Sequence, residues 1–174
     1  MIKHELGKWN LDELAKNPNR KTIDRTLAKI ESDAKRFEKI KKSLNPKVSS
    51  GKFLKLIRDI ENITEKSSTI GGYASLRYSE NTQSDEATAL LTRISKFGSE
   101  IENRLLFFDL WWKRQVDEKN AKRLIKSTGQ FSEYLRFKRL LAKYSLSEPE
   151  EKIINTLDVT GASALVKLYD KITN

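Results

Sequence analysis

The chain has 174 residues, of which 37% are hydrophobic and 33% are charged, and it carries a net charge of +10 with no cysteine. The missing cysteines exclude disulfides, thiolate metal sites and cysteine nucleophiles, and no apolar run approaches the roughly 18 residues that a membrane span needs. The length fits one domain over residues 1–174, and the N-terminus has no signal-peptide core, which predicts a cytoplasmic protein.

Two helices are predicted in the first quarter of the chain. Asn10 is a good N-cap for a short helix, because acidic residues follow it in what would be the first turn. From about residue 21 to residue 44, apolar side chains recur every three or four positions, which predicts an amphipathic helix. The apolar positions of this stripe are Ile23, Leu27, Ile30, Ala34, Phe37, Ile40 and Leu44.

A second long helix is predicted over about residues 50–78. Its apolar stripe consists of Phe53, Leu56, Ile57, Ile60, Ile63, Ile70 and Ala74. Gly71-Gly72 lies inside this pattern, and each glycine in a helix costs about 1 kcal/mol relative to alanine. The pair indicates a kink, a close helix crossing or a break into two helices, and the sequence does not distinguish among these.

The third predicted helix begins after Ser84, a good N-cap, and continues for about 30 residues. Its last part, Leu105 to Trp112, is apolar on nearly all sides. A helix of this kind is either central in its bundle or covered by another domain. Phe107, Phe108, Trp111 and Trp112 are therefore a candidate interdomain or partner surface, with burial in the chain's own core as the alternative.

Shorter helices are predicted for the rest of the chain. A basic helix over 118–126 precedes one over about 130–144, which is expected to turn Tyr134, Phe137, Leu140, Leu141 and Tyr144 toward the core. Two more helices flank Gly161, the first of them opened by a capping box of Ser147 and Glu150. The fold class predicted is all-α, a bundle of long, mostly antiparallel amphipathic helices.

The positive charge is concentrated in two segments. Residues 1–46 contain twelve Lys and Arg against seven Asp and Glu, and residues 111–144 contain ten against three. Such segments fit nucleic acid or an acidic partner, although a solvated face on long helices is the simpler interpretation.

No catalytic motif is present in the sequence. His4 is the only histidine, and His4-Glu5-Leu6-Gly7-Lys8 has a lysine where the zinc motif H-E-x-x-H needs its second histidine. Asp109 is the acid inside the apolar segment, and its expected partner is Lys113 one turn further on or a basic residue of another helix. We therefore assign no catalytic and no metal-binding residue, and the residues indicate a binding or structural module.

Several short stretches nevertheless follow a family pattern. They are Trp9 to Leu14, Tyr73 to Tyr78 with the Asn81-Thr82 turn, Phe107 to Leu110, Leu146 to Ile154, and Thr160 to Ala164 with Leu168 to Asp170. In this order and spacing the chain resembles the N-terminal region of oligoendopeptidase F and related M3-type zinc metallopeptidases. The Leu146 to Ile154 stretch is the most specific part of this resemblance.

The resemblance implies a helical lobe that forms one wall of a cleft for oligopeptide substrates. In that family a catalytic lobe follows, with a zinc ion on an H-E-x-x-H helix, and no stretch of this chain corresponds to it. We therefore expect no cofactor in this chain and no activity of the chain alone. Its expected partner is the missing C-terminal catalytic lobe, and Ser147 to Thr173 would lead toward the junction between the two lobes. The alternatives are a free-standing basic helical module for nucleic acid or an acidic protein, and a bundle that self-associates; no membrane partner is expected.

Overall fold

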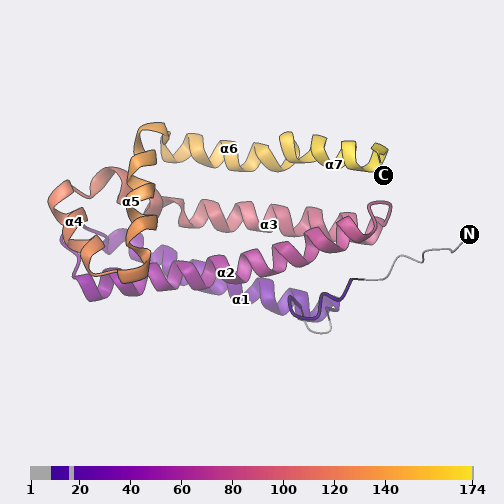
Figure 1. Cartoon of the computed structure of the whole chain (residues 1–174), viewed down its shortest axis with the longest axis horizontal. Helices are drawn as coiled ribbons and strands as arrows, with labels where there is room; N and C mark the ends of the chain where they lie inside the picture. Colours follow the sequence, from indigo (N-terminus) through magenta and orange to yellow (C-terminus); the bar gives the residue numbers. More distant parts are fainter. Residues whose placement is uncertain (1–8, 16–17, 174) are drawn as a thin grey trace, which may run out of the picture.

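The fold is built on three long antiparallel helices. The computed structural model describes residues 9–15 and 18–173, and all regular secondary structure in these ranges is helical. The long helices are α1 (Arg20–Glu38), α2 (Ser50–Glu80) and α3 (Asp85–Leu110), and they lie side by side in alternating directions (Figure 1). Because α3 contacts α1, α2 and α6, it is the central helix. The predicted all-α bundle is confirmed.

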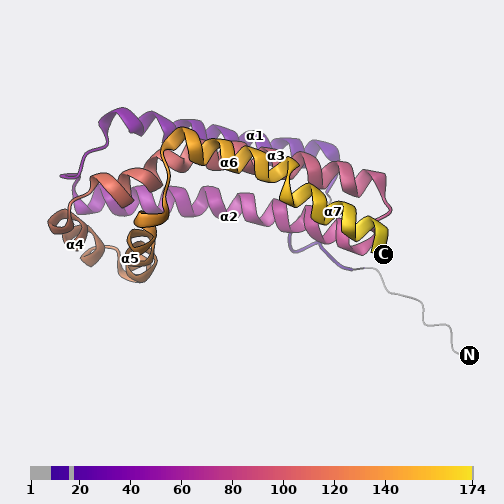
Figure 2. The ribbon, with the colours of Figure 1, turned by 90° about the horizontal axis from the view of Figure 1, so that it is seen from above.

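Shorter helices cover one end and one side of this body. α4 (Glu118–Lys126) and α5 (Ser132–Leu140) lie at one end, and α6 (Glu148–Thr160) and α7 (Ala162–Thr173) run back along α3 (Figure 2). A π-helical turn, Trp111–Gln115, connects α3 to α4, and short 3-10 helices cover Lys39–Ser43, Gly129–Phe131 and Leu141–Tyr144. The chain therefore has a three-helix body and an outer layer formed by its last two helices.

Several helices begin directly after a residue whose side chain caps the helix. Asn19 accepts a hydrogen bond from the Thr22 backbone N–H at 3.0 Å, Ser84 from that of Ala87 at 3.2 Å, and Asp117 from that of Asn120 at 2.9 Å. Each cap satisfies a backbone donor that the first helical turn leaves without a partner.

The core lies between α1, α2 and α3 and continues under α4 and α5. The predicted stripe of α1 is buried from Ile23 to Phe37, and that of α2 is buried at every predicted position except Ile60, which is half-buried. The largest side chains with almost no exposed surface are Trp112, Phe53, Ile30, Ile63, Leu124 and Leu135.

Gly71-Gly72 does not interrupt α2, which is continuous over 31 residues. A Cβ atom built on either glycine would meet nothing within 4 Å, so no neighbouring element requires the missing side chain. Of the three possibilities left open by the sequence, both the break and the close crossing are excluded.

Two local predictions are wrong. The residues after Asn10 form a single turn, in which the Leu11 carbonyl accepts from the backbone N–H groups of Leu14 and Ala15, because the segment is too short to hold a helix. In the segment over 130–144, Tyr134, Phe137, Leu140 and Tyr144 are exposed and Leu141 is half-buried. Its buried residue is Leu135, and the Leu135 carbonyl accepts a hydrogen bond from Trp112 Nε1, so α5 packs on the core through the side that carries Leu135.

Candidate interaction surface

The four aromatic residues proposed as a surface form the centre of the core. Their exposed fractions lie between 1% and 6%, and their rings pack closely against those of α1 and α2. The ring centroids of Phe37 and Phe108 are 5.5 Å apart, and those of Phe53 and Trp112 are 5.0 Å apart. Phe107 is 5.8 Å from Phe37, and Trp111 is 5.3 Å from Phe108. In this arrangement aromatic pairs contribute energy beyond their buried area.

The structure therefore corrects the assignment of Phe107, Phe108, Trp111 and Trp112 as a partner surface. The segment is covered by the chain's own later helices, and Trp112 Nε1 donates a hydrogen bond at 3.0 Å to the Leu135 carbonyl of α5. The apolar pattern correctly predicted burial. It did not identify the covering element, because that depends on how α4 and α5 fold back after the π-helical turn.

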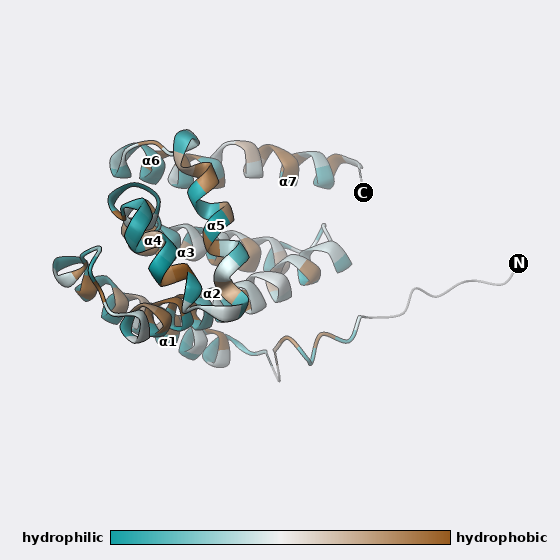
Figure 3. Cartoon of the chain, turned by 60° about the vertical axis from the view of Figure 1, so that its left-hand side comes forward, coloured by the Kyte–Doolittle hydropathy of each residue, from teal (hydrophilic) through white to brown (hydrophobic). Residues whose placement is uncertain are grey.

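The exposed apolar surface lies instead on the outer layer. Neither α6 nor α7 has a buried residue, and eight large apolar side chains on them are 50–75% exposed. Figure 3 shows apolar segments along both helices. We call this surface the α6–α7 apolar face, and it consists of Ile153, Ile154, Leu157, Leu165, Val166, Leu168, Tyr169 and Ile172.

The contact between α6 and α3 is polar. Ser99 Oγ of α3 donates to the Asn155 carbonyl at 2.9 Å, and Asn155 Nδ2 donates to Asn103 Oδ1 at 3.0 Å. Asn103 Nδ2 in turn donates to Thr156 Oγ1 at 3.4 Å. Helix α6 thus directs Asn155 at the bundle and leaves Ile153, Ile154 and Leu157 at least half exposed, whereas an ordinary surface helix buries such apolar side chains.

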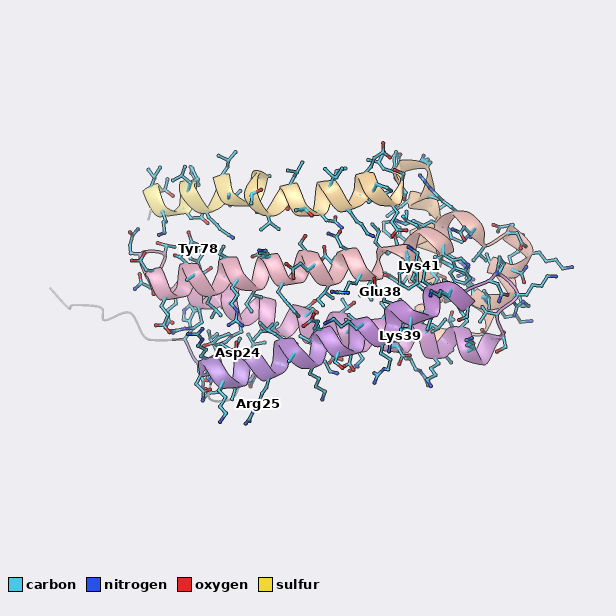
Figure 4. All side chains as sticks on the ribbon, turned by 180° about the vertical axis from the view of Figure 1, so that it is seen from behind. Asp24, Arg25, Glu38, Lys39, Lys41 and Tyr78 are labelled. Atoms are coloured by element: carbon cyan, nitrogen blue, oxygen red, sulfur yellow. The ribbon has the colours of Figure 1, made fainter. Side chains whose placement is uncertain are left out.

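The start of α6 is held to the body by an ion-pair cluster. Glu148 accepts hydrogen bonds from Lys41 Nζ at 2.9 Å and from Lys152 Nζ at 2.7 Å. Figure 4 shows Lys41 beyond the end of α1, on the 3-10 helix that follows it. The hydrogen bonds from Lys152 and Lys41 lower the pKa of Glu148 below its ordinary value.

Helix α7 is joined through its backbone carbonyls to the end of α2 and to the turn between α2 and α3. Tyr78 Oη donates to the Lys167 carbonyl at 3.1 Å, and Gln83 Nε2 donates to the Lys171 carbonyl at 3.2 Å. Tyr78 lies at the opposite end of the bundle from Lys41 (Figure 4). Burial is the main cause that raises the pKa of Tyr78, and the negative charge of Asp170 raises it further.

Several basic side chains in residues 111–144 bind acidic side chains or backbone carbonyls of the same chain. Asp109 pairs with Lys113, as predicted, and also with Lys138 of α5 at 3.0 Å. Arg139 donates to the carbonyls of Trp112 and Val116 at 2.9 and 2.8 Å, and it pairs with Glu118. These contacts favour a structural role for this basic segment.

The described residues offer no cluster of side chains that could bind a metal ion. No three His, Cys, Asp or Glu side chains within residues 9–15 and 18–173 lie where they could hold a metal ion, so this part of the chain does not fit zinc. His4-Glu5 lies outside the described residues. Among the helices of the described part, none is long and apolar enough to cross a membrane.

By its fold, the chain is an all-α protein with an outer helical layer that exposes apolar side chains. The family model of the M3-peptidase N-terminal domain, described as oligopeptidase F, matches residues 114–174. The resemblance to the N-terminal region of oligoendopeptidase F is thus confirmed over these residues, which run from the π-helical turn through α7 and include the Leu146 to Ile154 stretch. No curated protein and no solved structure matches the chain.

Proposed function

We propose that the chain acts as the N-terminal helical lobe of an oligoendopeptidase F-like zinc metallopeptidase, and that it walls a cleft for oligopeptides beside a catalytic lobe. The family match over residues 114–174 carries this proposal. The zinc ligands and the general base would belong to the catalytic lobe, so the chain alone is expected to be inactive.

The α6–α7 apolar face supports an interdomain role. It lies wholly within the matched residues and has more exposed large apolar side chains than the three long helices of the body. Burial of one such side chain stabilises a contact by about 1.5–3 kcal/mol. We propose that this face, rather than the buried aromatic segment, contacts the catalytic lobe.

Reconstitution tests both parts of the proposal. The purified chain is mixed with zinc and a quenched fluorescent oligopeptide, in the absence and presence of a separately expressed catalytic domain of an oligoendopeptidase F. We expect no hydrolysis by the chain alone and an increase over the activity of the catalytic domain when both are present. Zinc-dependent cleavage by the chain alone would contradict the expected inactivity.

A pair of variants tests the face itself. Leu157→Ser with Leu168→Ser should weaken binding to the catalytic domain at least about tenfold, because two exposed leucines would lose their burial in the complex. Trp9→Ser is the matched control, because Trp9 is 50% exposed but lies outside the matched residues, and it should bind as the wild type does. Equal binding by all three proteins would exclude the α6–α7 apolar face as the contact.

A further inference from the structure

A groove runs along the side of the bundle between α2 and α6, with α3 as its floor. Its larger part has a volume of about 790 Å³ and reaches the end of α3 beside α5, and its smaller part of about 500 Å³ continues along α3 under α6. The two parts share the lining residues Thr64, Ser68, Glu102, Leu105 and Asn155, so they form one groove. In Figure 1, α3 lies between α2 and α6, and α5 lies at one end of these helices, where Tyr134, Leu135 and Lys138 line the groove.

The groove is as long as a helix of ordinary length. Its lining residues on α3 and the following turn extend from Leu91 to Trp112, which corresponds to about 30 Å at the helical rise of 1.5 Å per residue. A helix of roughly 20 residues has this length. The described lining contains helices and no strand edge, so it offers no backbone pairing to an extended peptide, whereas a helix satisfies its own backbone.

The lining combines apolar side chains with unbalanced negative charge. Leu105, Leu106, Ile60, Phe131 and Tyr134 are half-buried or exposed along it. Glu61, Glu65, Glu102 and Asp158 also line it, and within the described part of the chain none of these four forms an ion pair.

Lys138 is the one cation among the described lining residues, and Asp109 already pairs with it. In a chain of net charge +10, this groove is therefore a local region of negative charge.

The carboxyl of Glu102 is the most central of these acids, because it lines both parts of the groove. Its side chain is exposed, but the groove walls remove part of its hydration. This desolvation raises the pKa of Glu102, and the negative charge of Asp158 raises it further, whereas Lys138 lowers it. A cation placed beside Glu102 would relieve this cost, so the site favours a positively charged occupant.

We infer that the groove binds a cationic amphipathic α-helix of a protein partner, with its apolar face on α3 and its Lys or Arg side chains beside Glu61, Glu65 and Glu102. The contact would complete a bundle in which α2, α3 and α6 supply three helices and the partner supplies one. This inference is independent of the proposed peptidase role, because its test uses the chain alone.

Fluorescence anisotropy with a synthetic helix tests the inference. The probe is a labelled peptide of roughly 20 residues, composed of Leu and Lys in helical register, and it is titrated with the purified chain at about 0.1 M salt. We expect saturable binding that weakens as salt rises. A peptide of the same composition with two central prolines is expected to bind at least tenfold more weakly, because it does not form the helix.

Variants of the groove locate the binding. Glu61→Gln, Glu65→Gln and Glu102→Gln combined should weaken binding of the Lys peptide about tenfold or more. Glu100→Gln is the matched control, because Glu100 lies on the same helix as Glu102 but outside the groove lining, and it should change the affinity less than twofold. The triple variant should keep the helicity and the midpoint of chemical unfolding of the wild type, because none of the three carboxylates forms an ion pair among the described residues, so weaker binding would not reflect a damaged fold.

Three outcomes would overturn the inference. The first is equal affinity of the triple variant and the wild type for the Lys peptide, and the second is an equal loss in Glu100→Gln. The third is a stable dimer of the chain in sedimentation that the triple variant abolishes, because a second copy would then be the occupant. A peptide with Glu in place of Lys is the charge control. If it binds to the basic surfaces of the chain, its affinity for the triple variant should equal its affinity for the wild type.

Discussion

Two adjacent tryptophans in the π-helical turn after α3 differ in their hydrogen bonds. Trp112 Nε1 donates to the Leu135 carbonyl, and the guanidinium of Arg139 lies 5.5 Å from the Trp112 ring centroid. Trp111 Nε1 is buried and has no hydrogen-bond partner among the described residues. The two side chains are almost equally buried, at 1% and 2% exposed, so they form a natural comparison.

Replacement of each tryptophan by phenylalanine should separate packing from hydrogen bonding. Trp112→Phe should lower the free energy of unfolding about 1–3 kcal/mol more than Trp111→Phe, because it leaves the Leu135 carbonyl without its donor. Trp111→Phe loses comparable ring volume but removes a donor that has no partner. Chemical denaturation of both variants measures the difference, and a larger loss in Trp111→Phe would contradict the assignment.

At the scale of the helices, Gly161 sets the junction between α6 and α7. A Cβ atom at Gly161 would lie 2.8 Å from the Leu157 carbonyl oxygen, which is a backbone atom that moves only with its helix. Its own N–H donates to this oxygen at 2.7 Å and ends α6. The glycine therefore permits a close approach that no other residue allows without a shift of the two helices.

Alanine substitutions at two glycines should have opposite effects. Gly161→Ala should destabilise the junction and lower the helicity of α6 and α7, because its Cβ meets the Leu157 carbonyl. Gly72→Ala, inside the continuous α2, should raise the free energy of unfolding by about 0.5–1 kcal/mol, because its Cβ meets nothing. Circular dichroism with chemical denaturation measures both, and a stable Gly161→Ala protein with unchanged helicity would contradict the role given to Gly161.

Local patterns predicted most helices but did not predict which surface stays exposed. The stripes of α1 and α2, the Ser84 cap and the pairing of Ser147 with Glu150 follow from periodicity and capping chemistry, and the structure confirms them. The burial of Phe107 and Trp112 also follows from their apolar surroundings. The exposure of Phe137 and Leu157 does not, because an amphipathic helix has the same sequence pattern whether its apolar face meets this chain or another.

At the scale of the whole molecule, the outer layer and the body differ in how they are held. The body has a continuous apolar core, whereas α6 and α7 have no buried residue and are joined to it by polar contacts at Asn155, Tyr78 and Glu148. Segments with few buried apolar contacts open at lower free energy than the core does. The outer layer should therefore open locally while the body stays folded, which suits a layer that adjusts to a partner.

Acid should weaken the attachment of this layer through Glu148. The hydrogen bonds from Lys152 and Lys41 lower the pKa of Glu148 in the folded state. The Glu148 carboxylate therefore contributes fully to stability above its ordinary pKa of 4.5, and this contribution is lost as the pH falls through the lowered pKa. Glu148→Gln should lower the opening free energy of α6 by about 0.5–1 kcal/mol at pH 7, and this difference from the wild type should vanish once the pH is low enough to protonate Glu148 in the folded state. Amide hydrogen exchange, corrected for the intrinsic rate at each pH, measures it, with Glu100→Gln as the control.

A difference that grows as the pH falls would contradict this sign. It would mean that the neutral form of Glu148 holds α6, in conflict with its ion pairs to Lys41 and Lys152. A difference of equal size at α2 would show instead that α6 and the body unfold together. The expected result is a pH-dependent difference confined to the outer layer, because Glu148 joins only that layer to the 3-10 helix after α1.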